Sequence, residues 1–219
     1  MTKLAAVIFD LDGVLVDTAR FHYLAWQRLA DEEGVPFDRE FNERFKGVSR
    51  RECVRMLFPD RPDPEKLTSL ATRKNEYYKE MVETLTPADL FEGARPLIEE
   101  LRRAGVLTAI ASVSKNTARV VEKLEVQALF DAVVDGNDVV NSKPAPDVFL
   151  LTAERLVVAP GECVVLEDAQ AGVVAAHAAG MPAVGIGSPQ RLHQAQCVVA
   201  SVREISVAML IDVVEGRDR

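Results

Sequence analysis

The sequence lacks the features that are typical of membrane, nucleic-acid-binding and disulfide-stabilised proteins. No apolar run reaches the about 20 residues that a membrane-spanning helix needs, and the N-terminus lacks the basic region, long apolar segment and cleavage site of a signal peptide. The formal net charge is −8 without a basic cluster, which argues against nucleic-acid binding. The three cysteines are odd in number and lack metal-ligand spacing. We therefore expect a reduced, cytoplasmic protein with neither a membrane nor a nucleic acid as partner.

Apolar residues, by contrast, are plentiful enough to build a large core. Of the 219 residues, 48% are hydrophobic and 27% are charged, a balance typical of globular proteins. The length suits one large α/β domain, or a core with a modest insertion. Cys163 opens an apolar, strand-like run, so we expect it in the core. We also expect the chain to act as a monomer.

A short apolar run near the N-terminus ends in two carboxylates and a glycine. Residues 5–9 are rich in β-branched and aromatic side chains, which is typical of a buried strand, and Asp10, Asp12 and Gly13 follow. Ligands bind at the carboxyl ends of strands in open α/β sheets. Two like charges there are unfavourable unless a cation or a shared proton relieves them. The run predicts a Mg²⁺ site beside a phosphate, and the alternative is a solvated turn after the strand.

The rest of the chain divides into a helical stretch and an alternating stretch. We expect helices at 19–33, near 38–45, and at 50–57 and 64–83. Thereafter we expect helices at 93–104, 115–124, 146–157 and 169–179, and strands at 106–111, 132–134, 163–166 and 182–186. Strands separated by helices imply right-handed crossovers and a parallel sheet.

This order predicts an α/β fold with a Rossmann-like parallel sheet flanked by helices. The first strand is separated from the others by the helical stretch, so we expect a helical cap domain inserted after that strand. Residues 1–16 and 88–219 would form the catalytic core, and residues 17–87 would form the cap.

Polar residues also follow the later predicted strands. Ser112 opens a helix, where it would bind an anion or act as an ordinary N-cap. Lys143 precedes a proline-initiated helix, where it is either a fixed point charge or a surface lysine. Glu167 and Asp168 form a second acidic pair, although acids also suit a helix N-terminus on electrostatic grounds. Four such strand ends in one chain indicate a composite site.

At these residues the sequence resembles the haloacid dehalogenase superfamily, whose four motifs occur here in order. Within it, the chain is similar to mutases that act on glucose phosphates, over the stretches DLDGVLVDT (10–18), His22 to Trp26, KGVSR (46–50), ASVSKN (111–116), SKPAPD (142–147) and LEDAQAG (166–172). The resemblance implies that Asp10 is the nucleophile and forms an aspartyl-phosphate, and that Asp12 is the general acid and base. It also implies that Ser112 and Lys143 hold the transferring phosphoryl group.

The resemblance further implies a metal cofactor and a set of substrate contacts. Mg²⁺ would be bound by Asp10, the backbone carbonyl of Asp12 and Asp168, with Glu167 close by. The implied contacts to a small sugar phosphate are Thr18, His22, Trp26, Lys46, Gly47, Val48, Ser49, Arg50, Lys74, Asn75, Ser114, Lys115 and Asn116. For the helical residues among them, the alternative is a packed helix face. Cys53 departs from the pattern, because a serine facing the substrate is expected there.

The helical insertion decides between a mutase and a phosphatase, because a mutase must hold a second phosphate opposite the nucleophile. Ser49 and Glu52 form a capping-box pattern with Arg50 and Arg51 in the first turn, where the helix dipole disfavours cations. A bound phosphate would reverse that cost. Alternatively, the arginines point to solvent and pair with Glu43 or Glu52.

We expect a Mg²⁺-dependent mutase that interconverts β-glucose 1-phosphate and glucose 6-phosphate through an aspartyl-phosphate and glucose 1,6-bisphosphate. The nearest alternative is a phosphatase for a small sugar phosphate that uses the same nucleophile. A phospho-aspartate receiver module is a third possibility, but receivers phosphorylate an aspartate on a later strand and lack a helical insertion.

Overall fold

The protein is built on one parallel sheet of six strands, in the order β3-β2-β1-β4-β5-β6. The computed structural model describes residues 4–45, 48–58 and 62–217. The strands are β1 (Ala6–Phe9), β2 (Leu107–Ala111), β3 (Ala132–Val134), β4 (Cys163–Glu167), β5 (Ala183–Ile186) and β6 (Cys197–Val199). Each neighbouring pair is parallel, which confirms the predicted Rossmann-like sheet.

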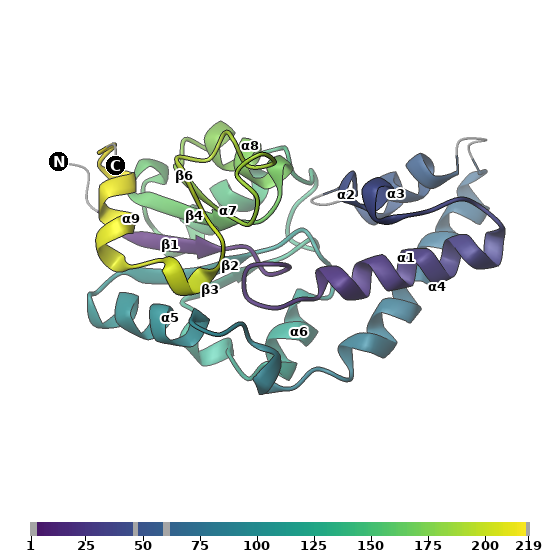
Figure 1. Cartoon of the computed structure of the whole chain (residues 1–219), viewed down its shortest axis with the longest axis horizontal. Helices are drawn as coiled ribbons and strands as arrows, with labels where there is room; N and C mark the ends of the chain where they lie inside the picture. The colour runs from purple at the N-terminus through teal and green to yellow at the C-terminus, as the bar shows by residue number, and fades with distance from the viewer. Residues whose placement is uncertain (1–3, 46–47, 59–61, 218–219) are drawn as a thin grey trace.

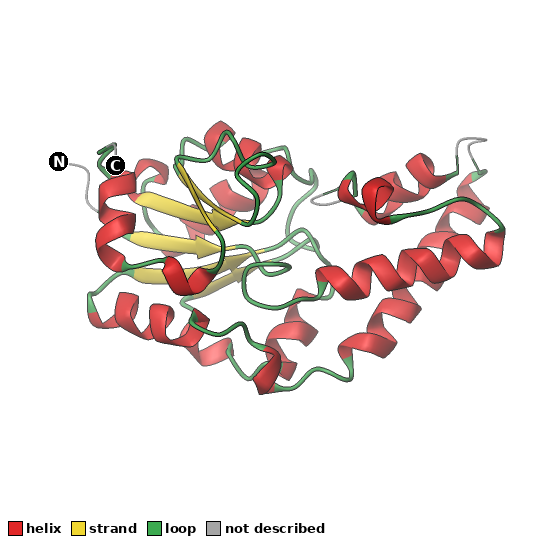
Figure 2. Cartoon of the chain, in the orientation of Figure 1, coloured by secondary structure: helices red, strands yellow, loops and turns green. Residues whose placement is uncertain are grey.

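Helices cover both faces of the sheet (Figure 2). They are α5 (Ala94–Arg103), α6 (Thr117–Lys123), α7 (Asp147–Leu156), α8 (Gln170–Ala178) and α9 (Val207–Val214). Short 3-10 helices are η1 (Pro87–Asp89), η2 (Gln127–Leu129), η3 (Pro160–Glu162) and η4 (Val202–Glu204). Side chains alternate along β1, so that Val7 and Phe9 pack with α5, α6 and α9 while Ala6 and Ile8 pack with α7 and α8.

Four helices are inserted between β1 and α5, and they lie beyond the carboxyl ends of the strands (Figure 1). We call these four helices the helical insertion. They are α1 (Ala19–Glu33), α2 (Arg39–Glu43), α3 (Arg50–Leu57) and α4 (Pro64–Val82). The long helices α1 and α4 pack against each other. The insertion after the first strand is therefore confirmed. No helix in the described part of the chain is long and apolar enough to cross a membrane.

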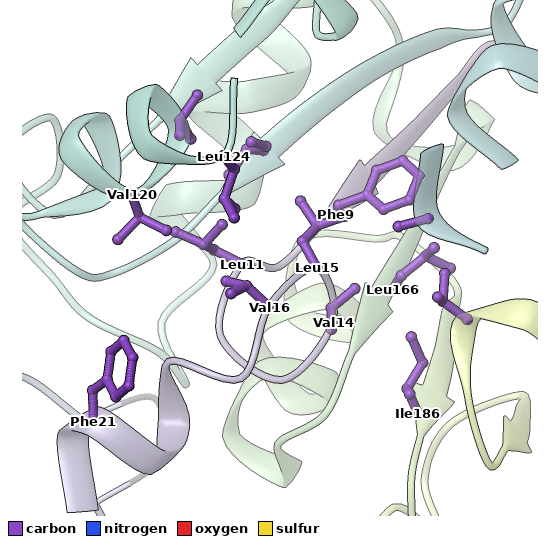
Figure 3. Packing of buried hydrophobic residues seen from close by; sticks show 14 of the residues in the cluster. Phe9, Leu11, Val14, Leu15, Val16, Phe21, Val120, Leu124, Leu166 and Ile186 are labelled. Atoms are coloured by element: carbon purple, nitrogen blue, oxygen red, sulfur yellow. The ribbon is translucent and has the colours of Figure 1, made fainter. Parts of the chain in front are cut away.

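The turn after β1 joins the two parts through a shared apolar cluster. Leu11, Val14, Leu15 and Val16 are all buried and pack with Phe9 of β1 and with residues of the helical insertion (Figure 3). The backbone amide of Gly13 donates to the carbonyl of Val16 at 2.8 Å and closes the turn. The tight apolar turn fixes the backbone that carries Asp10 and Asp12.

The last strand and the last helix are additions to the predicted fold. Strand β6 has only three residues, all half-buried, at the edge of the sheet. Helix α9 is apolar almost throughout, and a short apolar run has no period that separates helix from strand. Ser206 caps α9 by accepting a hydrogen bond from the amide of Met209 at 3.2 Å.

Candidate active site

The predicted strand-end residues meet at the carboxyl edge of the sheet. Asp10 follows β1, and its backbone amide still donates to the carbonyl of Leu166 in β4 at 2.9 Å. The ladder therefore holds Asp10 in register beside Glu167, which ends β4. Ser112 follows β2 and is almost fully buried, and its hydroxyl accepts from the amide of Ser114 at 3.1 Å.

Lys143 is buried between two carboxylates. Its Nζ donates to Oδ1 of Asp10 at 2.5 Å, to Oε2 of Glu167 at 2.7 Å and to the carbonyl of Ala111 at 3.4 Å. An ammonium group has three donors, and each has an acceptor here. Burial alone would lower the pKa of Lys143, but the Asp10 and Glu167 carboxylates raise that pKa above its ordinary value. The two carboxylates therefore favour the charged form of Lys143.

Three carboxylates form a candidate metal site. Asp10, Glu167 and Asp168 each offer an oxygen, and these ligand atoms lie within 4.8 Å of one another. Carboxylate oxygens are the ligands that Mg²⁺ prefers. Burial, together with the Asp10 charge, raises the pKa of Glu167, because Lys143 alone does not compensate this much negative charge. The residues fit a divalent cation. The predicted carbonyl ligand from Asp12 stays a prediction.

Two glycines make room for these carboxylates, because neither has a side chain that would overlap with them. A Cβ on Gly13 would lie 2.5 Å from Oδ2 of Asp168, and the φ of Gly13 is +87°. A Cβ on Gly172 would lie 2.0 Å from Cδ of Glu167. Gly172, in the first turn of α8, therefore has a role that the motif alone did not reveal.

Asp12 contacts two residues at the start of the helical insertion. The Thr18 hydroxyl donates to Oδ1 of Asp12, and Nε2 of His22 lies 3.8 Å from Oδ2. Desolvation and the nearby Asp10 carboxylate raise the pKa of Asp12 to about 7, against the opposing effect of the Thr18 hydrogen bond. A carboxyl group with such a pKa can both donate and accept a proton near neutrality.

A buried lysine lies at the insertion end of the site. Lys74 of α4 is 1% exposed, and its Nζ lies 2.8 Å from Nδ1 of His22 and 5.0 Å from the ring centres of Trp26 and Tyr78. Within the described part of the chain, Lys74 forms no ion pair with a carboxylate. Burial and the charge of Arg50 lower the pKa of Lys74 to about 7.

The N-terminus of α3 presents two arginines that form no ion pair with any acidic residue in the described part of the chain. Ser49 is the N-cap, as predicted, and accepts from the amide of Glu52 at 3.4 Å. The Glu52 carboxylate pairs with Arg55 at 2.8 Å, and Glu43 pairs with Arg191. The pairing alternative for Arg50 and Arg51 is therefore wrong, since neither forms an ion pair with another described residue.

These groups surround a cavity of about 480 Å³ between the sheet and the helical insertion. Of the predicted site residues, the wall includes Asp10, Asp12, His22, Trp26, Val48, Ser49, Arg50, Lys74, Ser112, Ser114, Lys115, Lys143, Glu167 and Asp168. The sequence did not single out several other wall residues: Asn42, Phe45, Ala71, Val139 and Val140. Their place depends on how the helical insertion lies over the sheet, for which the sequence carries no local signal.

Three of the predicted substrate contacts are described but do not lie in the cavity wall, and two others are not among the described residues. Thr18 is fully buried beneath Asp12. Asn116 donates to the side chain of Asn75 at 2.9 Å, so these two amides join the core to the insertion. Lys46 and Gly47 lie outside the described residues.

Cys53 lines the cavity as a neutral thiol. It is 2% exposed, and its Sγ lies 3.7 Å from the carbonyl of Val48 and 3.9 Å from that of Phe45. Burial raises the pKa of Cys53 to about 12, despite the opposing charge of Lys74. The thiol contributes a weak donor to this wall, where a serine would contribute a strong one.

Comparison with known proteins gives concordant matches. A family model described as haloacid dehalogenase-like hydrolase matches residues 7–186. The chain is 39% identical over 210 residues to the β-phosphoglucomutase of Bacillus subtilis (strain 168), covering 94% of this chain and 93% of that protein. It is 33% identical over 178 residues to a phosphorylated carbohydrates phosphatase of Thermotoga maritima, covering 80% and 82%.

A solved structure is similar over nearly the whole chain. The crystal structure of a β-phosphoglucomutase from Clostridium difficile superposes with a TM-score of 0.92 at 34% sequence identity. The superposition covers 97% of this chain and 98% of that one, so it includes the helical insertion as well as the sheet.

Proposed function

The chain belongs to the haloacid dehalogenase-like hydrolases, and from that premise we propose that it interconverts β-glucose 1-phosphate and glucose 6-phosphate. The single observation that carries the proposal is the distribution of cations in the cavity. Lys115 and Lys143 come from the core, at the sheet end, and Arg50, Arg51 and Lys74 come from the insertion at the other end. A sugar with phosphates at both ends, glucose 1,6-bisphosphate, matches this arrangement.

Asp10 is the proposed nucleophile. Its carboxylate oxygen attacks the phosphorus atom, an acyl phosphate bond forms, and the bond from phosphorus to the sugar oxygen breaks. Lys143, fixed by Glu167 and by the Ala111 carbonyl, offsets the repulsion between the two anions. The reverse step passes the phosphoryl group to the other hydroxyl of the sugar.

Asp12 is the proposed proton carrier. In its protonated form it donates to the sugar oxygen that leaves phosphorus, and in its ionised form it accepts the proton of the hydroxyl that attacks the aspartyl-phosphate. A pKa of about 7 supports both roles. Thr18 and His22 orient the carboxyl group from the insertion side.

Mg²⁺ is the proposed cofactor, held by Asp10, Glu167 and Asp168. When bound, it would supply positive charge beside the transferring phosphoryl group. We further propose that residues 17–87 act as a cap and that residues 1–16 and 88–219 form the catalytic core, so that substrate enters while the two are apart.

A sugar-phosphate phosphatase is the alternative, and the similarity to the Thermotoga maritima phosphatase supports it. The two activities differ in the group that receives the phosphoryl group, which is water in one and a sugar hydroxyl in the other. The cations at the insertion end, which pair with no carboxylate of the described residues, favour the mutase, because a phosphatase needs to bind only one phosphate.

One assay separates these activities. The protein would be given β-glucose 1-phosphate, Mg²⁺ and a catalytic amount of glucose 1,6-bisphosphate, and glucose 6-phosphate and released phosphate would be followed together. We expect glucose 6-phosphate to form at least about tenfold faster than phosphate. Phosphate release at the faster rate would overturn the mutase proposal in favour of the phosphatase, and an Asp10→Asn preparation controls for contaminating enzymes.

A further inference from the structure

We propose that Arg191 is a positioning residue that holds the helical insertion closed over the cavity by pairing with Glu43. Arg191 lies in the loop between β5 and β6, and its Nη1 donates to Oε2 of Glu43 in α2. The inference rests on the proposed role of residues 17–87 as a cap, but not on the proposed reaction, because it concerns access to the cavity for any phosphate ester that enters it.

The pair joins the core to the insertion at a different place from several other polar contacts between them. Among the described residues these include Asp12 with Thr18 and His22, Asn116 with Asn75, and Arg119 and Lys123 with Glu83 at the end of α4. The insertion residues of these contacts lie on α1, α4 or the chain that leads into or out of them. Figure 1 shows α2 above α1 and α6 below it, so Arg191 acts on the opposite side from α6.

The loop that carries Arg191 is firmly anchored. The amide of Gly187 donates to the carbonyl of Val199 at 2.8 Å, and the amide of Gln196 donates to that of Ala183 at 3.0 Å. Leu192, the next residue after Arg191, is 1% exposed and packs into the core. Arg191 therefore extends from a fixed base.

Glu43 is equally well connected to the cavity wall. It ends α2 between Phe41 and Phe45, whose ring centres lie 5.5 Å apart. Phe45 packs edge-on against Trp26 at 5.1 Å, and both line the cavity. An ion pair at Glu43 therefore holds α2 in place and, through the packing of Phe45, also the aromatic wall around Trp26.

The exposure of the two side chains sets how much the Arg191–Glu43 pair can contribute to closure. The side chains of Arg191 and Glu43 are 57% and 41% exposed, so solvent screens the pair and its contribution is modest. An exposed pair of this kind changes an equilibrium by about twofold to fivefold. Such a change matters for a closing motion whose open and closed states are close in free energy.

Trp26 provides the measurement, because it is the one tryptophan of the sequence and is only 3% exposed while α2 and α3 lie over the cavity as in this structure. Quenching of its fluorescence by acrylamide, without any ligand, reports how often the wall opens. We expect Arg191→Ala to raise the quenching constant about twofold to fivefold, with an unchanged melting temperature. In the wild type, about 1 M NaCl should have the same effect, because it screens exposed charges.

Two further variants make the test decisive. Arg203→Ala removes a comparably exposed arginine that pairs with Glu92 at 2.9 Å within the core, and it should leave the quenching unchanged. The charge exchange Glu43→Arg with Arg191→Glu should restore wild-type quenching, which a merely structural effect of either position would not do. Equal quenching in Arg191→Ala and Arg203→Ala, or a charge exchange that fails to restore it, would overturn the proposal.

Discussion

The two ends of the cavity differ in how their charges are compensated. At the sheet end, Lys143 is hydrogen-bonded to Asp10 and Glu167, so cation and carboxylates stabilise one another without a ligand. At the insertion end, Lys74 is buried beside His22 and Trp26, and no carboxylate of the described residues pairs with it. One end is preorganised for chemistry, whereas the other becomes favourable only when an anion binds.

The largest expected effect tests the sheet end. We expect Asp10→Asn to abolish turnover, because an amide cannot form the acyl phosphate. The variant keeps the shape of the side chain, so circular dichroism should show an unchanged fold. Substrate turnover and phosphorylation by acetyl phosphate would both be measured. Activity above a trace in a clean preparation would remove Asp10 as the nucleophile.

The next effect tests whether the sheet end depends on close approach of the backbone. Gly172→Ala would bring a Cβ to 2.0 Å from Cδ of Glu167, so the carboxylate must shift. We expect the concentration of Mg²⁺ that gives half-maximal turnover to rise by about 10- to 100-fold, the range for lost support of a metal ligand. Gly161→Ala is the matched control, because no atom lies within 4 Å of its added Cβ. Equal Mg²⁺ titrations in the two variants would contradict the assigned metal site.

The contrast between the two ends also explains what the sequence could predict. Asp10, Ser112, Lys143 and Glu167 each follow a strand or precede a helix, and parallel strands bring their carboxyl ends together whatever the details of packing. Local patterns therefore located the sheet end. Arg50 was also found from a local pattern, namely its place in the first turn of a helix capped by Ser49.

The remaining wall could not be predicted because it depends on how two separate parts of the chain meet. Phe45 and Val139 come from the insertion and from a loop of the core, and the way the two parts meet brings both to one cavity. The pairing of Glu43 with Arg191 has the same origin, and it speaks against the alternative in which Glu43 would pair with the arginines of α3. Strand β6 escaped prediction because three half-buried residues give no clear alternation.

A third prediction tests the insertion end directly. Arg50→Ala removes a cation that lines the cavity and forms no ion pair with another described residue, so binding of glucose 1,6-bisphosphate should weaken by about tenfold or more. Phosphorylation of Asp10 by acetyl phosphate should barely change, because that donor has no second phosphate. Arg51 also lines the cavity but is more exposed, so Arg51→Ala should have a smaller effect of the same kind.

Arg55→Ala is the control for both variants, since Arg55 lies on the same helix and pairs with Glu52. The measurements are isothermal titration with the bisphosphate and the rate of phosphorylation by acetyl phosphate. If Arg50→Ala slowed both equally, the two ends would not be distinct and a phosphatase would be the better description.

The charge state of Lys74 gives a pH-dependent test of the same end. Its pKa of about 7 lies below the ordinary 10.5, so between these values the folded protein binds fewer protons than the unfolded chain. The contribution of Lys74 to the free energy of unfolding therefore rises as the pH increases from about 7 to 10.5, and it falls again as the pH is lowered through this range. A bound phosphate favours the charged lysine, so ligand binding near pH 8 should take up protons, up to one from this group.

Titration calorimetry in buffers of different ionisation enthalpy measures that uptake. At pH 6 the uptake should be smaller, because Lys74 is already protonated there in the free protein. The Lys74→Met variant should lose the difference between the two pH values while keeping the volume of the side chain. The same uptake at pH 8 in this variant would assign the proton to another group.

The smallest expected effect lies at neither end and separates stability from function. Val157 ends α7 in the left-handed region, with φ 58° and ψ 45°, and its side chain is 90% exposed. A β-branched residue in this conformation costs about 1 kcal/mol relative to glycine, and its exposed side chain contributes little packing in return. We expect Val157→Gly to raise the free energy of unfolding by up to about 1 kcal/mol in urea titrations, with turnover and bisphosphate binding unchanged. The substitution leaves both ends of the cavity untouched. If turnover or bisphosphate binding nevertheless changed with stability, the effects of Gly172→Ala and Arg50→Ala would reflect global stability and not the charges that distinguish the two ends.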